Sequence, residues 1–73
     1  DNMSGMFARA TSFNQPLNTW NIRSVFDMKQ MFAGATSFNQ NVSNWDVRKV
    51  REWEDFSKNS PINWTNKVPA KFR

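Results

Sequence analysis

An internal repeat constrains this chain more strongly than any other feature of its sequence. The segment 3–15 returns as the segment 28–40, and both copies end in the same string, Thr-Ser-Phe-Asn-Gln. Apolar residues farther along return at the same offset, as in Trp20 and Trp45 or Ile22 and Val47. One unit of this length cannot cover its own apolar face, so neighbouring units must stack and bury it.

Two spacings alternate within a unit. Apolar residues in the range 28–35 follow the i, i+3, i+4, i+7 pattern, which predicts a short helix. Asp27 is placed to cap this helix, and Gln30 completes a capping-box pattern. In the other half, Trp20 and Ile22 are two positions apart, which predicts a very short strand with both side chains on one face. The equivalent positions 45 and 47 predict the same strand in the second unit.

The two halves together predict an α/β repeat fold. We expect a leucine-rich-repeat-like solenoid fragment, with short parallel strands and short helices in about two 25-residue coils and a C-terminal cap. Residues 1–51 would hold the two units, and residues 52–73 a degenerate third unit and the cap. Equivalent side chains should then form columns: Met6 over Met31 and Phe56, Trp20 over Trp45, and Phe13 over Phe38.

Asn14 and Asn39 recur next to the phenylalanines of the return segment. A buried Asn at a fixed place in each unit can bond the backbone of its own turn and of the next coil. The sequence therefore predicts a structural ladder of these residues, with a binding role as the alternative.

Charge and residue usage narrow the chemistry. Residues 1–47 are neutral overall, whereas residues 48–73 carry seven basic groups against three acidic ones. That excess fits either the solvated charges of a cap or a contact with nucleic acid or an acidic surface. The chain has no His and no Cys, so it lacks the usual bases, thiol nucleophiles and zinc ligands. We expect no enzyme activity, no metal and no cofactor, and no stretch is apolar enough to span a membrane.

The expected strands leave a set of outward-facing polar residues. Because Trp20 and Ile22 would point into the core, their neighbours would form a small platform with Arg23 and Arg48 stacked about 5 Å apart. These candidate ligand-binding residues are Thr19, Asn21, Arg23, Asn44, Asp46 and Arg48. The platform suits an acidic partner, and a solvated sheet face with nearby counter-ions is the alternative.

The string 31–40, Met-Phe-Ala-Gly-Ala-Thr-Ser-Phe-Asn-Gln, is followed after a short gap by Trp45-Asp46-Val47. Over roughly residues 2–57 this pattern resembles the BspA-type leucine-rich-repeat family, in particular the mycoplasma surface lipoprotein repeats of unknown function. The resemblance implies a C-terminal fragment of a cell-surface or extracellular, lipid-anchored protein with a role in adhesion. That family commonly has Ser where Arg23 and Arg48 stand, which implies a more basic surface in this chain.

We therefore hypothesise a non-enzymatic surface module for protein–protein contact or adhesion, acting through the outward face of its short parallel sheet. The expected partner is another protein or a component of a host surface. The alternative is a purely structural spacer within a longer array, and binding of nucleic acid or an acidic polymer is the least favoured hypothesis.

Overall fold

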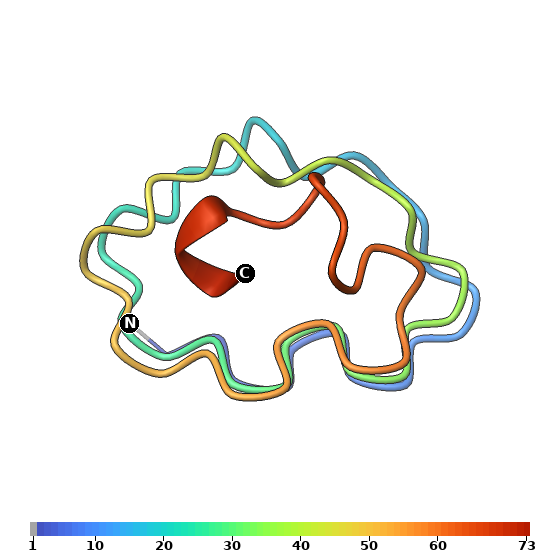
Figure 1. Cartoon of the computed structure of the whole chain (residues 1–73). Coiled ribbons are helices and arrows are strands. Elements are labelled where there is room, and N and C mark those ends of the chain that lie inside the picture. Colours follow the sequence, from blue (N-terminus) through green and yellow to red (C-terminus); the bar gives the residue numbers. More distant parts are fainter. Residues whose placement is uncertain (1) are drawn as a thin grey trace.

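Hydrogen bonds between successive units determine the path of the backbone in the computed structural model, which describes residues 2–73. Alternate N–H groups of residues 3–9 donate to carbonyls of residues 27–33, and those of residues 28–34 donate to residues 52–58. We call residues 3–9, 28–34 and 53–59 the three wall segments; Figure 1 shows them lying over one another. The bonds, 2.7–3.0 Å long, join Met3 to Asp27, Gly5 to Lys29, Phe7 to Met31, Arg9 to Ala33, Met28 to Glu52, Gln30 to Glu54, Phe32 to Phe56 and Gly34 to Lys58.

Each wall segment consists of consecutive four-residue turns. In the second wall segment, Met31 N–H donates to the Met28 carbonyl at 3.2 Å, and Ala35 N–H donates to the Phe32 carbonyl at 3.0 Å. The third residue of such a turn adopts a positive φ, 57° at Gln30 and 71° at Gly34. The same turn positions are left-handed in the other wall segments, at Gly5, Arg9, Asp55 and Asn59.

The predicted helix over 28–35 is wrong, and the turns explain why. Two consecutive four-residue turns place their first and last residues, 28, 31, 32 and 35, on the inner side. That is the same i, i+3, i+4, i+7 spacing that an amphipathic helix produces. A left-handed Gln30 cannot belong to a right-handed helix, and its N–H bonds Glu54 instead of a carbonyl four positions back.

The predicted fold class, a leucine-rich-repeat-like solenoid of short parallel strands and helices, is also wrong. Within residues 2–73 the only helix is the 3-10 turn η1 (Ala70–Phe72), and no sheet forms. Strand-like pairing is limited to isolated parallel bridges from Asp27 to Asn2 and to Glu52. The expected strands at 20–22 and 45–47 instead adjoin turns, closed by Trp20 N–H to Leu17 and Trp45 N–H to Val42. The bonds between segments thus run through the half of the unit that was expected to be helical.

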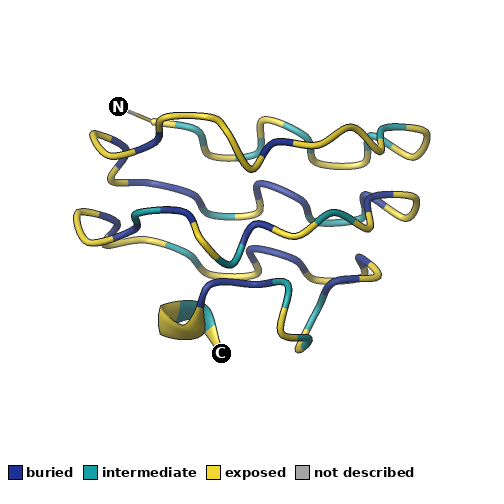
Figure 2. Cartoon of the chain, turned by 90° about the horizontal axis from the view of Figure 1, so that it is seen from above, coloured by how far each residue is buried: buried dark blue, intermediate teal, exposed yellow. Residues whose placement is uncertain are grey.

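The core lies between the wall and the segments that return across the molecule. Met28, Met31, Phe32, Ala35 and Phe38 of the second unit have no exposed surface, because chain segments cover them on both sides. Figure 2 shows the first level largely exposed and long buried stretches in the levels below it. Aromatic rings carry the stacking between levels: Phe7 lies 5.5 Å from Phe32, and Phe13 lies 5.8 Å from Phe38, with nearly parallel ring planes.

In the expected columns, the residue from the first unit is less buried than its partner from the second unit. Met31 and Phe56 are buried, whereas Met6 is 50% exposed. Trp45 is buried and donates its indole N–H to the Leu17 carbonyl at 2.9 Å, whereas Trp20 is 42% exposed. The first unit therefore contributes less buried surface than its sequence similarity to the second unit suggests.

Residues 60–73, which we call the cap, leave the repeat path and cover the end of the core (Figure 1). Val42 N–H donates to the Lys67 carbonyl at 2.9 Å, which fixes the cap against the second unit. The Lys71 ammonium donates to the carbonyls of Val47 and Val50 at 3.1 and 2.6 Å. The Phe72 ring stacks on Trp53 at 5.3 Å, so the aromatic end of the core is closed by the cap.

Candidate functional site

The candidate site with the most charge is a hollow formed by turns of the two units. In the first unit, the Asn21 side-chain oxygen accepts hydrogen bonds from the backbone N–H and Nε of Arg23, both at 3.2 Å. In the second, Asp46 Oδ1 accepts from the backbone N–H and Nε of Arg48 at 3.3 and 2.9 Å. An Asn or Asp that bonds the backbone two positions on forms a local turn, so the same motif recurs for a physical reason.

Asp46 holds Arg48 more firmly than Asn21 holds Arg23. A second bond joins Arg48 Nη2 to Asp46 Oδ2 at 2.8 Å, so the guanidinium and the carboxylate pair through two bonds. The hydrogen bonds from Arg48 lower the pKa of the Asp46 carboxyl from 3.8 to about 2, and the nearby charge of Arg23 acts in the same direction. The same pairing raises the pKa of the Arg48 guanidinium, whose side chain is 86% exposed.

The hollow has a volume of about 530 Å³ and is lined by Arg23, Ser24, Asp46, Arg48 and Lys49. We call it the arginine hollow. Three cationic side chains face one carboxylate, so the lining is positively charged overall. It can bind carboxylate or phosphate groups, because an oriented guanidinium offers paired donors to planar anions.

The six predicted surface residues do not form one platform. Arg23, Asp46 and Arg48 line the arginine hollow, and Asn21 adjoins it through its bonds to Arg23. Asn44 lies apart, in a second hollow of about 440 Å³ that it shares with Asn18, Gln40, Asn41 and Ser43. Thr19 is exposed on the turn before Trp20. The turns separate these residues because they replace the straight strands that would have aligned them.

Asn14 and Asn39 join neighbouring segments through their side chains. Asn14 Oδ1 accepts from the backbone N–H of Asn39 and from the Gln40 side-chain amide, both at 2.9 Å. One level farther on, Asn39 Oδ1 accepts from the Lys67 ammonium at 2.7 Å. Both asparagines are exposed, not buried as expected, so these bonds run along the surface of the stack.

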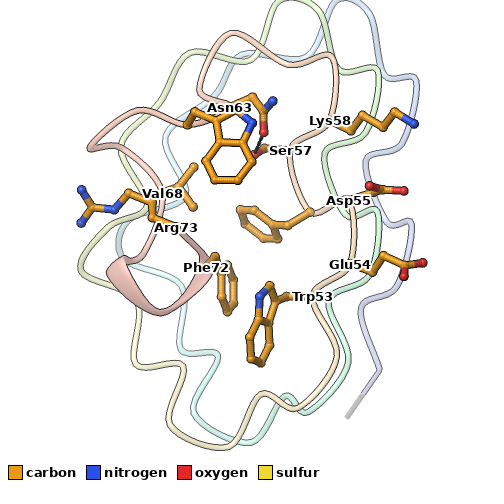
Figure 3. A pocket seen from close by; sticks show the side chains of 11 residues that line it. Trp53, Glu54, Asp55, Ser57, Lys58, Asn63, Val68, Phe72 and Arg73 are labelled. Carbon is orange, nitrogen blue, oxygen red and sulfur yellow. Dashed lines mark hydrogen bonds between the residues drawn. The ribbon is translucent and has the colours of Figure 1, made fainter.

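A hollow of about 390 Å³ that the sequence did not predict lies between the third wall segment and the cap (Figure 3). We call it the cap groove. Trp53 and Phe72 lie side by side in it, and the Ser57 hydroxyl donates to Asn63 Oδ1 at 2.9 Å. The lining residues are Trp53, Glu54, Asp55, Phe56, Ser57, Lys58, Asn63, Trp64, Val68, Phe72 and Arg73. Trp64 and Phe72, aromatic residues outside the repeat, were the signals in the sequence, and in the structure Trp64 is 79% exposed.

The arginine hollow and the cap groove offer different kinds of chemical groups. No group of three or more His, Cys, Asp or Glu side chains in residues 2–73 is arranged to hold a metal ion. In the same range, no helix is long and apolar enough to cross a membrane. The arginine hollow offers donors to anions, and the cap groove offers aromatic faces beside polar groups.

Comparison with known proteins gives one informative result. No curated protein and no solved structure matches the chain. A family model described as "Mycoplasma protein of unknown function, DUF285" matches residues 1–67, which is most of the chain. This match agrees with the mycoplasma part of the resemblance over residues 2–57 and does not show a BspA-type leucine-rich-repeat family. The chain belongs to the DUF285 family of mycoplasma proteins of unknown function.

Proposed function

We propose that this chain is a non-enzymatic repeat module that contacts another protein through the arginine hollow. The observation that carries the proposal is the pairing of Asp46 with Arg48, which holds an 86% exposed guanidinium in one orientation. Arg23 and Lys49 line the same hollow, so the cations exceed the carboxylates three to one. A pre-oriented, positively charged hollow is suited to carboxylate groups on the surface of a partner.

The charges elsewhere favour a protein partner over nucleic acid. The basic excess in residues 48–73 suggested nucleic-acid binding, but two of its lysines have internal bonds. The Lys67 ammonium donates to the Asn39 side chain, and the Lys71 ammonium donates to backbone carbonyls of residues 47 and 50. Lys71 also lies 5.2 Å from the centre of the Trp53 ring. Cations that stabilise the cap are not free to follow a phosphate backbone.

The location of the module is part of the same proposal. The resemblance of residues 2–57 to BspA-type surface repeats supports a cell-surface or extracellular protein that takes part in adhesion, with a lipid anchor on the parent protein. A host surface component is then the natural partner. A spacer in a longer repeat array is the second candidate, because neighbouring segments already join through Asn14 and Asn39.

The test is a binding titration with a fluorescent hexa-aspartate peptide at low and physiological salt. We expect the double variant R23S/R48S to weaken binding at least tenfold while its melting temperature stays nearly unchanged, because these side chains are exposed. The control R9S/R51S removes the same charge from exposed positions outside the hollow and should bind like the unmodified chain.

Equal binding by the unmodified chain and R23S/R48S would refute the role of the arginine hollow. An absence of binding to the acidic peptide by all variants would favour the spacer. Tighter binding to a single-stranded oligonucleotide, with affinity falling steeply as salt rises, would favour nucleic acid.

A further inference from the structure

The cap packs Phe72 against Trp53 and Phe56 of the third wall segment, but residues 60–73 accept no hydrogen bond from its alternate backbone N–H groups. In the first two wall segments, alternate N–H groups donate to the equivalent stretch of the next unit. The equivalent N–H groups of the third belong to Trp53, Asp55, Ser57 and Asn59, and none of them has a partner within residues 2–73. The repeat directs these donors toward the end of the molecule, where three of the four residues line the cap groove.

One of these donors is in an unusual environment. Ser57 is only 5% exposed, and its hydroxyl already bonds Asn63, so its backbone N–H lies next to the groove without a partner among the described residues. Buried backbone donors in folded proteins nearly always have a partner from the protein or from a bound molecule. The Phe72 ring of the cap lies 4.8 Å from Phe56 and covers it with apolar surface. No carbonyl of residues 60–73 accepts a hydrogen bond from the row of backbone donors in the third wall segment.

Trp64 gives a second, independent observation at the same groove. It is 79% exposed and has a φ of 62°, a conformation that a bulky side chain rarely adopts. The turn that holds it is fixed by the N–H and hydroxyl of Thr65, both of which donate to the Ile62 carbonyl. Gly or Asn suits this backbone better, and only a small part of the Trp64 surface is buried to offset the strain. Strained and exposed bulky residues mark binding surfaces more often than packing positions.

We propose that the cap groove binds a peptide segment, whose backbone carbonyls accept hydrogen bonds from the third wall segment and whose apolar side chain packs against Trp64. The chain already binds its own segments in this way twice, since residues 27–33 and 52–58 accept the same row of bonds. A peptide carries carbonyls at the regular spacing that this row of donors requires. Glu54 and Asp55 offset Lys58 and Arg73 in the lining, so the site selects for shape and hydrogen bonding, not for charge.

The probe is a terminally blocked peptide with the sequence of residues 26–35, whose carbonyls at 27, 29, 31 and 33 accept these bonds from the first wall segment. Its Asp and Lys cancel, so it does not target the arginine hollow. Titration into nitrogen-15-labelled chain should shift the amide signals of Asp55, Ser57 and Asn59 and the indole signal of Trp64. A scrambled peptide of the same composition serves as the control.

Two substitutions separate binding from folding. W64N relieves the backbone strain, so we expect an equal or higher melting temperature together with at least tenfold weaker peptide binding. W64F keeps an aromatic face and should retain most of the binding. R23S/R48S should bind this peptide like the unmodified chain, so the result is independent of the proposed function.

Three results would overturn the peptide site. One is the absence of peptide-dependent shifts at the three amides, and another is unchanged binding by W64N. The third is a response of these signals to a β-linked tetramer of N-acetylglucosamine and not to the peptide, which would assign the aromatic groove to carbohydrate.

Discussion

The left-handed turns of the wall can be tested by exchanging glycine between two positions of the second wall segment. Gln30 and Gly34 both have positive φ, 57° and 71°. If residues 28–35 formed the helix that their periodicity suggests, G34A would stabilise the chain and Q30G would destabilise it, each by about 0.5–1 kcal/mol. The turns predict the opposite sign at Gly34, which makes the pair of substitutions decisive.

Two effects determine how much G34A changes the free energy of unfolding. A side chain in the left-handed region loses about 1–2 kcal/mol relative to glycine. The added methyl group also reduces the conformational freedom of the unfolded chain, which stabilises the folded state by about 0.4–1 kcal/mol. A Cβ at position 34 would lie 3.5 Å from Arg9 Cγ, an ordinary contact, so no clash adds to the loss. The difference is a net destabilisation of about 1 kcal/mol, and Q30G should be neutral or stabilising.

Thermal unfolding followed by tryptophan fluorescence measures both variants. In a domain of this size about 1 kcal/mol corresponds to a shift of about 4–8 °C in melting temperature. G5A is the matched control, because Gly5 has a φ of 66° and open space around its Cβ position. The change in melting temperature of G5A therefore measures the backbone effect alone. A rise in melting temperature for G34A, or a fall of several degrees for Q30G, would refute the turn architecture.

The buried aromatic centre and the Asp46 carboxyl give two more measurable results. F32A should destabilise the chain by about 3–5 kcal/mol, because Phe32 has no exposed surface and its ring lies 4.1 Å from that of Phe38. F13A removes a half-buried ring, so urea unfolding should show a clearly smaller loss of stability than for F32A. Equal losses of stability would contradict the packing. Since the pKa of Asp46 is lowered from 3.8 to about 2, its pairing adds a small stabilisation above about pH 4, small because the pair is exposed, and this is lost as the pH falls through 2. NMR titration should give this midpoint and show it rising toward 3.8 in R48S; an unchanged midpoint would contradict the assigned cause.

The repeat period was readable from the sequence, and the local conformation was not. Residues that recur at this period indicate which side chains meet between units, as Phe13 and Phe38 do. The apolar spacing within a unit does not separate a helix from two consecutive turns, because both put positions 28, 31, 32 and 35 on one side. A glycine at position 34 and a glutamine at position 30 gave no common signal for a positive φ.

The two hollows differ in how much of each the sequence could reveal. Arg23 and Arg48 occupy equivalent positions, so their shared surface followed from the period alone. The cap groove depends on where residues 60–73 lie, and these residues have no counterpart in the repeat. The left-handed conformation of Trp64 likewise depends on a turn that no local pattern specifies.

Backbone hydrogen bonds hold the wall together, and this determines where recognition can lie. Because the ladder needs no particular side chain, the outward positions of each turn are free to differ, as Lys29 and Glu54 do at equivalent places. The inner positions must stay apolar, and the left-handed positions favour Gly or Asn, although Arg9 and Gln30 also occupy them. Trp64 occupies a left-handed position that suits Gly or Asn better. The cations of the arginine hollow, by contrast, lie at exposed positions where the turns accept any polar side chain. Both features lie on exposed side chains, so W64N and R23S/R48S can remove them with little effect on the packing of the core.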